Sequence, residues 1–474
     1  MISATENCGD IWSTDYLSRE ELSALQLKKL QATVKLCYEN VPLTRKRMDE
    51  RGVRPEHIKT LADIALLPFM KKVDLRDEYP TGLVASPMRD IVTLKDIAKL
   101  PFMKKTDLRD EYPTGLTAAP LSEIVRFHCS SGTTGKPICI PNTKGDIEIW
   151  ADATARCLAM FGLGREDVLQ VSFGYGLFTG GLGLHYGGEH LGCAVLPTST
   201  GSTEKQLMLM RDLGTTALAC TPSYFLHIIE VAQKLGIDFR RDTKLKHGIF
   251  GAEPWTDEMR EKIESASGIV AHDIYGLTEI SGPGVAGACE HTRGLHIFED
   301  HYYPEIVDPE TLEPLPDGEY GELVFTTLDR FGTPMVRYRT RDLTRLRAER
   351  CACGRTIRVM DRIKARSDDM LIVHGVNLFP SQVETALLSV PEVEPHYQIV
   401  ITPTATLDLL EIKVEVKAEA LSDNVREIEA LRKRVLGAVK QIIGLSPKII
   451  LVEPGSLPRS EGKIKRVIDN RKTA

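Results

Sequence analysis

Short apolar runs alternate with amphipathic stretches through the middle of this chain, and no other feature limits the fold as strongly. The apolar runs VLQVSF, CAVLP, ALACT and HGIFG begin at residues 168, 193, 217 and 247. Stretches such as EKQLMLMRDLG and DEMREKIESAS, which occur among them, have helical character. This alternation predicts β-α units, in which helices cover a mostly parallel sheet. We therefore expect an α/β fold.

The two ends of the chain have different patterns. From Leu22 to Tyr38 apolar residues recur at helical spacing, which predicts an amphipathic helix that ends before Pro42. After Glu305 the runs PEIVD, GELVFTTL and VRYRTRDLTRL are separated by Pro, Asp and Gly, which predicts a strand-rich, antiparallel subdomain. From about Lys364 onward, strand-like runs flank a long charged helix expected from Asp423 to Ile443, so we expect a small α+β domain there.

The length of the chain favours more than one domain. Its 474 residues exceed the roughly 250 to 300 residues at which single cores usually stop growing. The segment DRIKARSDDM is dense in charge and poor in apolar residues, which suits a hinge. We therefore expect a large domain over residues 1–363 and a small domain over residues 364–474.

A 33-residue segment occurs twice in succession. Residues 60–92 and 93–125 differ at eight of 33 aligned positions. A solenoid needs about three or more such units to bury a common core. We therefore interpret the pair as a tandem duplication, or as an artefact of sequence assembly, rather than as a repeat architecture. A surface insertion adds only on the order of 0.6 kcal/mol of loop entropy per doubling of length, so the fold tolerates one.

Charge and composition limit the kind of partner. A formal net charge of −6 argues against nucleic-acid binding. The N-terminal stretch MISATENCGDIWS has no signal-peptide pattern, and no run approaches about 18 apolar residues. Ten cysteines scattered along the chain are typical of reduced thiols rather than of a disulfide framework. We expect a cytoplasmic protein that acts on a small molecule and binds neither nucleic acid nor membrane.

A loop rich in Gly, Ser and Thr gives the strongest chemical signal. In HCSSGTTGKPICIP, glycines let backbone N–H groups approach phosphate oxygens, hydroxyls add donors and a lysine adds positive charge. The residues expected to bind phosphate are Ser130, Ser131, Gly132, Thr133, Thr134, Gly135 and Lys136. The Walker pattern is excluded because Pro137 follows the lysine and the glycines are too close together. A flexible Ser/Gly turn is the alternative.

Three further motifs are weaker when each is taken alone. In DIYGLTEISGPG, the ring of Tyr275 can stack on a base, and the hydroxyl of Thr278 beside the carboxylate of Glu279 can hold a phosphate and Mg²⁺. Asp342 in YRTRDLTRL can accept both hydroxyls of a ribose. Near the C-terminus, LPRSEGKIKRVIDN contains Lys463. The alternatives are an ordinary loop, a strand-end aspartate and a solvated turn.

Together and in this order, these segments resemble the acyl-adenylate-forming superfamily of acyl-CoA synthetases, adenylation domains and luciferases. Within it the chain is most similar to the phenylacetate-CoA ligase family. The resemblance covers about residues 12–471 and includes the runs FGYGLFTGGLGLHYGGEHLGC, GPGVAGACEH, EDHYYPEIVDP, YRTRDLTR and RSDDMLIVHGVNLFPSQVE. It implies an N-terminal AMP-binding (adenylation) domain, a mobile C-terminal lid domain and a single copy of the duplicated segment, which makes residues 60–92 the insertion.

The resemblance also implies a reaction. A carboxylate attacks the α-phosphorus of ATP to give an acyl adenylate and pyrophosphate, and the thiol of coenzyme A then displaces AMP. Lys463 matches the family's catalytic lysine, and Thr278 and Glu279 match the phosphate and magnesium positions. The lid is expected to carry the lysine in and then withdraw it by turning about a hinge at Asp368.

The remaining nucleotide contacts follow from the same resemblance. Asp342 and Arg366 match the ribose contacts. The residues expected to border the nucleotide are Gly251, Ala252, Glu253, Asp273, Tyr275 and Gly276.

An acyl pocket is expected in the aromatic and glycine run. Glycines permit close backbone approach while aromatic rings supply walls, which suits a flat slot for an aryl acid such as phenylacetate. The pocket residues are Phe173, Tyr175, Phe178, Gly180 and Gly181, with Gly183 beside them. Ordinary core packing is the alternative for each ring.

A structural zinc site is expected at a turn with two thiols. Cys351 and Cys353 stand in a C-x-C-G turn, and related sequences pair such a turn with a cysteine and a histidine that match Cys289 and His296. Three sulfurs and an imidazole complete a tetrahedral zinc site. The alternatives are His291 as the nitrogen ligand, or reduced thiols without metal.

Two departures from the family bear on the second half of the reaction. Ala365 stands where the family usually has Gly, and His374 stands where it has Arg or Lys, so coenzyme A transfer is less secure than adenylation. The alternatives are a relative that activates another acid, one that adenylylates a cofactor without coenzyme A, and a silent nucleotide sensor. Lys463 and Glu279 argue against the sensor. The family further implies phenylacetate catabolism and a homodimer.

Overall fold

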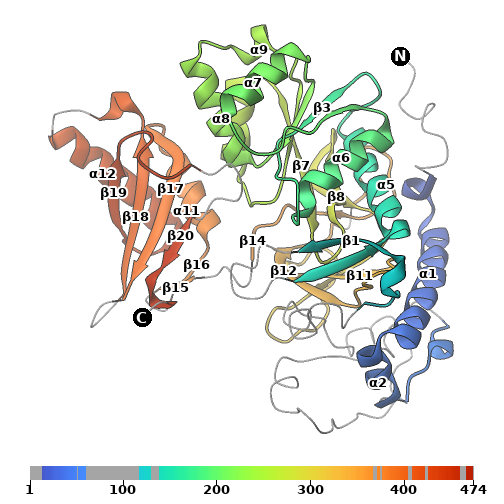
Figure 1. The fold of residues 1–474 in the computed structure, drawn as a ribbon. Coiled ribbons are helices and arrows are strands. Elements are labelled where there is room, and N and C mark those ends of the chain that lie inside the picture. Colours follow the sequence, from blue (N-terminus) through green and yellow to red (C-terminus); the bar gives the residue numbers. More distant parts are fainter. Residues whose placement is uncertain are drawn as a thin grey trace. The chain divides into compact units, whose positions relative to one another are not determined.

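A computed structural model (Figure 1) describes most of the chain and divides it into two compact units. The described residues are 13–50, 52–59, 117–129, 138–347, 349–366, 371–373, 376–403, 408–421, 425–459 and 466–472. The first unit contains residues 1–199 and 272–362. The second contains residues 200–271, called here the middle segment, and residues 363–474, called the C-terminal segment. Most of the duplication (residues 60–116), the phosphate loop at 130–136, Asp368, His374 and Lys463 lie outside the described residues.

The first unit begins with a helix at the predicted place. After the short turn η1 (Ser13–Tyr16), α1 spans Arg19–Asn40, and α2 (Pro42–Glu50) and η2 (Pro55–His57) follow. Ser18 starts α1 with a capping box, because its side chain accepts from the Glu21 amide while Glu21 accepts from the Ser18 amide at 2.8 Å. The helix expected over residues 22–38 is therefore confirmed.

The strands and helices that follow form layers in the first unit. Strands β1 (Ile124–Cys129), which follows the short η6 (Leu121–Glu123), and β2 (Cys139–Thr143) pair antiparallel, while β3 (Val168–Val171) and β4 (Ala194–Leu196) pair parallel. Strands β7 (Val270–Leu277), β8 (Gly282–Cys289), β9 (Thr292–Ile297) and β13 (Val359–Met360) continue in antiparallel pairs. Helices α5 (Lys144–Met160) and α6 (Thr179–Leu191) pack together closely, since a Cβ on Gly183 would lie 2.5 Å from Trp150 Cζ2.

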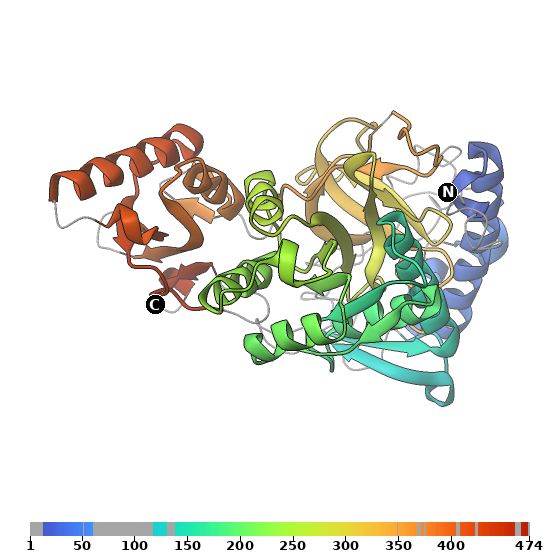
Figure 2. The ribbon, with the colours of Figure 1, turned by 90° about the horizontal axis from the view of Figure 1, so that it is seen from above.

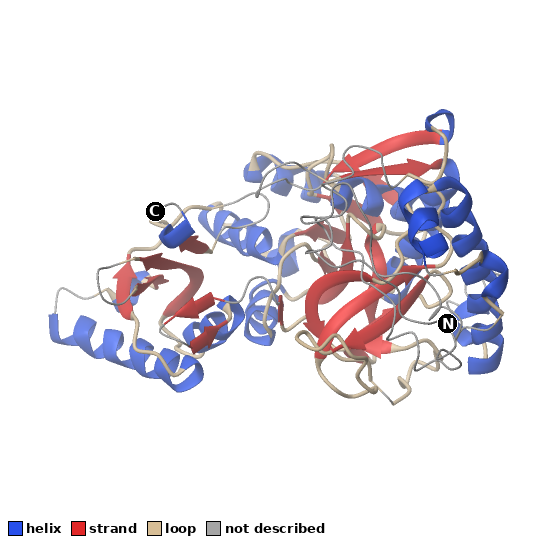
Figure 3. Ribbon diagram, turned by 90° about the horizontal axis from the view of Figure 1, so that it is seen from below, coloured by secondary structure: helices blue, strands red, loops and turns tan. Residues whose placement is uncertain are grey.

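The strand-rich part predicted after Glu305 is present and antiparallel (Figure 3, strands in red). It consists of β10 (Tyr302–Val307), β11 (Gly321–Thr327) and β12 (Tyr338–Thr344). Every residue of the central strand β11 is buried. Arg337 bonds Glu305 through two nitrogens at 2.7 and 2.9 Å, so the buried charges in this part are paired.

A buried ionic network attaches the N-terminal region to the rest of the first unit. Arg156 on α5 contacts Asp15, and it also bonds both oxygens of Asp300 at 2.9 and 3.2 Å. His301 Nδ1 lies 2.7 Å from Asp329 Oδ2, and Lys29 of α1 donates to the same carboxylate at 2.8 Å. Burial alone would lower the pKa of His301, but the charges of Asp300 and Asp329 outweigh it and raise that pKa to about 9.

The middle segment of the second unit has the expected β-α order. Strands β5 (Ala217–Cys220) and β6 (His247–Phe250) pair parallel. The helices are α7 (Thr203–Asp212), α8 (Pro222–Lys234), α9 (Phe239–Asp242) and α10 (Asp257–Ser267). Apolar side chains of these elements share one core that includes Leu207, Phe225 and Phe250.

The C-terminal segment is the small α+β part that the sequence predicts. After β14 (Ala365–Arg366), β15 (Leu371–Val373), β16 (Val376–Leu378) and α11 (Pro380–Leu388), a four-stranded sheet has the order β19-β18-β17-β20. Its strands are β17 (Val393–Thr402), β18 (Leu409–Val416), β19 (Lys448–Val452) and β20 (Val467–Asp469), with the short turns η7 (Ala418–Ala420) and η8 (Asn470–Lys472) nearby.

The long helix α12 (Val425–Ile443) lies along this sheet (Figure 2). Its buried side chains recur at helical spacing and join those of α11 and the strands in one core: Leu431, Val435, Val439 and Ile443. The charged helix expected near residues 423–443 is thus confirmed. Among the described residues, no helix is long and apolar enough to cross a membrane. The fold class α/β is confirmed, with antiparallel strands added to the parallel pairs.

Candidate functional site

The turn between β7 and β8 carries the predicted phosphate and magnesium residues. A Cβ on Gly276 would lie 1.6 Å from the carbonyl oxygen of Gly282, so the two strands approach here as only glycine permits. The turn that follows holds Thr278 and Glu279, which are 8% and 5% exposed. The backbone therefore fixes a hydroxyl and a carboxylate side by side.

A buried cation lies beside this turn. Arg330 donates from Nη1 to the Glu279 carbonyl oxygen at 3.1 Å and from Nη2 to Asn142 Oδ1 at 2.9 Å. Burial lowers the pKa of Arg330, although the charges of Asp146 and Glu279 oppose that effect. This arginine was not predicted, because nothing in TLDRFGTP distinguishes it from a surface residue.

The predicted adenine and ribose residues contact each other. Tyr275 Oη donates to Asp342 Oδ2 at 2.6 Å, which joins β7 to β12. The hydroxyl of Tyr275 thus orients the carboxylate assigned to the ribose, a contact that the sequence did not indicate. Asp273, four positions before Leu277 on the same strand, is paired with Arg362 at 3.0 Å.

The residues predicted to line an acyl pocket lie in the first unit, and their segment contacts the β7–β8 turn. Thr179, the first residue of α6, has its hydroxyl 3.4 Å from the hydroxyl of Thr278. Just before it, Phe178 is 42% exposed and Phe173 is buried, with ring centroids 6.2 Å apart. The ring of Phe178 covers Gly180, where a Cβ would lie 2.4 Å from Phe178 Cε1. An aromatic surface therefore adjoins the turn that carries Thr278 and Glu279.

Two further contacts fix the backbone around this surface. A Cβ on Gly181 would lie 2.8 Å from the carbonyl oxygen of Gly174, so this glycine is needed for close approach. Tyr175 Oη lies 3.2 Å from His185 Nδ1, and burial raises the pKa of Tyr175.

The strand that leads into the phosphate loop ends at the same place. The amide of Cys129, the last residue of β1, donates to the carbonyl oxygen of Leu177 at 3.0 Å. His128 Nδ1 lies 3.1 Å from the same oxygen. Cys129, which precedes Ser130 in the sequence, is therefore hydrogen-bonded to the segment that carries Phe173 and Phe178.

The other predicted nucleotide residues belong to the second unit. Gly251 and Ala252 follow β6, and Ala252 has a left-handed backbone with φ of 69°. Glu253 Oε1 accepts from the Ser223 amide at 2.8 Å, at the start of α8. Arg366 lies in β14. The roles assigned to these residues stay predictions.

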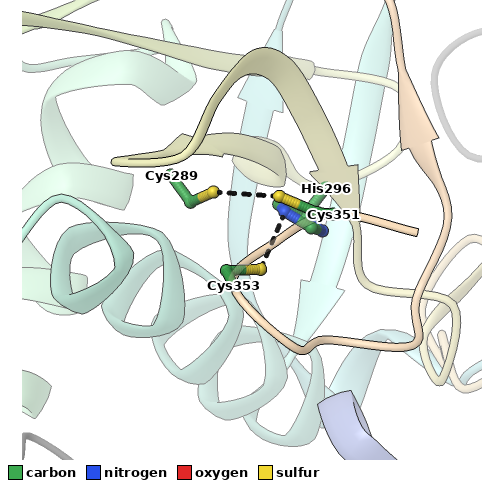
Figure 4. A group of neighbouring side chains, drawn as sticks. All are labelled: Cys289, His296, Cys351 and Cys353. Atoms are coloured by element: carbon green, nitrogen blue, oxygen red, sulfur yellow. Dashed lines mark hydrogen bonds between the residues drawn. The ribbon is translucent and has the colours of Figure 1, made fainter. Parts of the chain in front are cut away.

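The four predicted metal ligands lie together (Figure 4). Cys289 ends β8 and His296 lies in β9, while Cys351 and Cys353 come from the turn that Gly354 closes with φ of 83°. Their ligand atoms all lie within 4.8 Å of one another. His291, the alternative ligand, is not in this group and lies 3.6 Å from Glu290.

Two distances within this group match those between the ligands of a tetrahedral zinc ion. Bonds of about 2.3 Å to sulfur and 2.0 to 2.1 Å to nitrogen place tetrahedral ligands about 3.5 to 3.8 Å apart. The Sγ atoms of Cys289 and Cys351 are 3.6 Å apart, and Cys353 Sγ is 3.4 Å from His296 Nε2. Burial lowers the pKa of His296 to about 4, so its ring is neutral and able to ligate.

Comparison with protein families identifies both parts of the chain. Residues 80–328 match the model of the AMP-binding enzyme family, and residues 375–471 match the AMP-binding enzyme C-terminal domain. The chain is 45% identical to a phenylacetate-coenzyme A ligase of Thermus thermophilus over 470 residues, which cover 96% of this chain and 98% of that protein. It is also 45% identical to a phenylacetate-coenzyme A ligase of Escherichia coli, with 96% of each chain covered.

Solved structures give the same relationship at lower identity. A 2-hydroxyisobutyryl-CoA ligase, solved in the postadenylation state with an acyl-AMP bound, is 27% identical and has a TM-score of 0.84. The similarity covers 97% of this chain and 92% of that chain.

Proposed function

This chain belongs to the AMP-binding enzyme family and, within it, to the phenylacetate-coenzyme A ligases, and we propose on that premise that it activates phenylacetate or a similar aryl acid. It is an acid-thiol ligase that uses ATP. The observation that carries this conclusion is the identity of 45%, which extends over nearly the whole length of both chains.

The reaction has two steps with balanced products. A carboxylate oxygen of the acid bonds to the α-phosphorus of ATP, and the bond to pyrophosphate breaks. The sulfur of coenzyme A then bonds to the acyl carbon, AMP leaves, and the thiol gives up its proton. No nucleophile of the enzyme is needed, so the protein must orient the reactants and stabilise negative charge.

The first unit offers groups for these tasks. We assign Thr278 and Glu279 to the phosphates and Mg²⁺, because the turn fixes both side chains and carboxylate oxygens suit this ion. Asp342, oriented by Tyr275, is assigned to the ribose. The aromatic surface beside Thr179 is assigned to the ring of the acid. When bound, Mg²⁺ supplies positive charge to the phosphates of ATP.

We propose four further assignments from the sequence. The loop of residues 130–136 binds the phosphates of ATP, and Lys463 acts on the carboxylate and the α-phosphate. The middle segment contributes Gly251, Ala252 and Glu253 to the adenine site, and Arg366 adds to the ribose contacts.

A structural zinc ion is proposed at Cys289, His296, Cys351 and Cys353. The support is the gathering of the four ligand atoms within 4.8 Å and the two distances that match a tetrahedral ion. The ion would tie β8 and β9 to the turn after β12. The cysteines that the structure describes are free thiols, as is usual in the cytoplasm, and we propose that location for the enzyme. We also propose that it is a homodimer, because members of this family commonly are.

Pyrophosphate release tests the function. Purified enzyme with ATP and Mg²⁺ should release pyrophosphate with phenylacetate in preference to 2-hydroxyisobutyrate or hexanoate, and addition of coenzyme A should yield the thioester. Lys463→Ala should abolish adenylate formation. Preference for an aliphatic acid would reject the aryl assignment, and pyrophosphate release without thioester would favour an adenylate-forming relative that does not use coenzyme A.

A further inference from the structure

Arg459 is fixed by a buried carboxylate of its own segment. Its Nη1 and Nη2 donate to the two oxygens of Glu415 on β18, each at 2.8 Å. Glu415 is fully buried and also accepts from the amides of Gly455 and Leu457 at 3.0 and 2.8 Å. Residues 455–459 are therefore attached to the sheet of the C-terminal segment.

Arg466, seven positions later, is attached to the same sheet. Its carbonyl oxygen accepts from the Ile399 amide at 2.8 Å, where β20 begins to pair with β17. Its guanidinium is ion-paired with Glu384 and lies over the ring of Tyr397, 4.9 Å from the centroid. Lys463 lies in the sequence between these two anchored arginines.

A carboxylate of the middle segment reaches the first of these anchors. Glu230 on α8 accepts from Arg459 Nη2 at 3.2 Å and lies 2.8 Å from Nε2 of the buried His396 on β17. His227, one turn earlier on α8, faces the other oxygen of Glu230 at 3.4 Å. Burial alone would raise the pKa of Glu230, but the bonds from both histidines and the charge of Arg459 lower it.

One other ion pair and one longer-range electrostatic interaction occur along the same boundary. Lys262 on α10 bonds Glu394 on β17 at 2.9 Å. The charge of Glu253 acts on Arg466 and on Tyr397. Glu230 differs from Glu394 and Glu253. Of these three carboxylates, it alone is hydrogen-bonded to both Arg459 and His396. Arg459 precedes Lys463 in the sequence, and His396 lies on β17, the strand that pairs with β20 after that lysine.

We propose that Glu230 is a positioning residue for adenylate formation, because it holds the C-terminal segment against α8 through Arg459 and His396 and must release it before the thiol reacts. This inference rests on the proposed function, which assigns Lys463 to the first step and requires its withdrawal for the second. Arg459 and Arg466, which flank Lys463 in the sequence, are the described residues through which the proposal connects Glu230 to that lysine.

The strength of the contact suits a bond that breaks in each cycle. The side chains of Glu230 and Arg459 are 30% and 20% exposed, so water screens their attraction. In contrast, the bonds between Arg459 and the buried Glu415 should hold Arg459 on its own segment when its bond to Glu230 breaks. The bonds of Arg459 to Glu415 can therefore persist while its bond to Glu230 breaks and re-forms.

Separate measurement of the two steps tests this proposal. Glu230→Gln keeps the shape of the side chain and removes its charge. We expect the single-turnover rate of adenylate formation from phenylacetate and ATP to fall by about tenfold, as expected for loss of one charge-assisted hydrogen bond. The rate at which coenzyme A converts preformed adenylate to thioester should be unchanged or higher. Arg459→Gln combined with Glu230→Gln should cost less than the product of the single effects.

Glu411→Gln is the matched control. It removes the same charge from a carboxylate of the C-terminal segment. Among the described side chains, Glu411 pairs only with the exposed Lys448, at 2.7 Å. This substitution should leave both rates unchanged. Equal rates in wild type and Glu230→Gln, or an equal fall of both steps, would overturn the proposal. Failure of the proposed function shows itself differently, as a wild-type enzyme that forms no adenylate.

A measurement independent of activity completes the test. Amide hydrogen exchange in peptides covering residues 453–472 and 222–234 should be faster in Glu230→Gln than in wild type or Glu411→Gln. Unchanged exchange in these peptides would show that Glu230 does not hold Arg459 and His396 in solution, and this result does not depend on which acid the enzyme activates.

Discussion

The buried histidine of the ionic network should make stability depend on pH in the alkaline range. The pKa of His301 is raised from 6.5 to about 9 in the folded protein. A raised pKa means that the stabilisation is complete below the unfolded pKa and is lost as pH rises through the folded pKa. The window therefore runs from about pH 6.5 to about pH 9, opposite in direction to the acid sensitivity of paired carboxylates.

The magnitude follows from the two pKa values. Their difference, 9 minus 6.5, corresponds to about 3 kcal/mol at about 1.4 kcal/mol per pKa unit. At about pH 7 the unfolded histidine is already partly neutral, so about 2.5 kcal/mol remains, and at about pH 9.5 only a few tenths remain. His301 is 8% exposed, so solvent screening reduces this value little.

The measurement compares wild type with His301→Gln by urea unfolding between about pH 7 and about pH 9.5. Because other titrating groups are common to both proteins, the difference in their unfolding free energies isolates His301. That difference should shrink by about 2 kcal/mol as pH rises. His57→Gln changes a half-buried histidine in η2 that accepts from the Arg54 amide and lies outside the ionic network, so it should show no such trend. A difference that stays constant over this range would refute the assignment of charge to His301.

Three further predictions concern the metal group, the β7–β8 turn and the aromatic surface. Wild type should contain one zinc ion per chain, whereas Cys351→Ser should contain almost none and melt at a temperature about 5 °C lower or more. Cys193 is the control, because its Sγ contacts only the Gly164 carbonyl oxygen among its described partners. Cys193→Ser should therefore keep the metal. Gly276→Ala forces a Cβ onto the Gly282 carbonyl oxygen and should lower the urea-unfolding free energy by about 3 kcal/mol, whereas an unchanged midpoint would contradict the close approach. Phe178→Ala should raise the KM for phenylacetate by about tenfold with little change in the KM for ATP.

Local periodicity was sufficient for much of the fold. The spacing of apolar residues located α1, a long charged stretch located α12, and the alternation of apolar runs with helical stretches located β3 to β6. These features depend on neighbours in the sequence, so a single sequence displays them. Motif spacing likewise pointed to the four residues that the structure gathers at the turn of Cys351 and Cys353.

Contacts between distant charges were not predictable in the same way. With 27% of residues charged, nothing marks Arg330, Glu230 or Arg156 as a residue whose partner lies far along the chain. The hydrogen bond between Tyr275 and Asp342 was missed for a related reason, since each residue was interpreted separately as a nucleotide contact. Their pairing depends on the packing of β7 beside β12, which tertiary structure decides.

The buried arginine of the N-terminal network has a consequence for protein engineering and for evolution. Arg156 touches carboxylates at positions 15 and 300, which lie 141 and 144 residues away in sequence. Loss of one of these residues would leave the charges of the others buried without a partner. We therefore expect positions 15, 156 and 300 to vary together across homologous sequences. Chimaeras that exchange the first forty residues between homologues should succeed only when the incoming segment brings an aspartate at the position of Asp15 in η1.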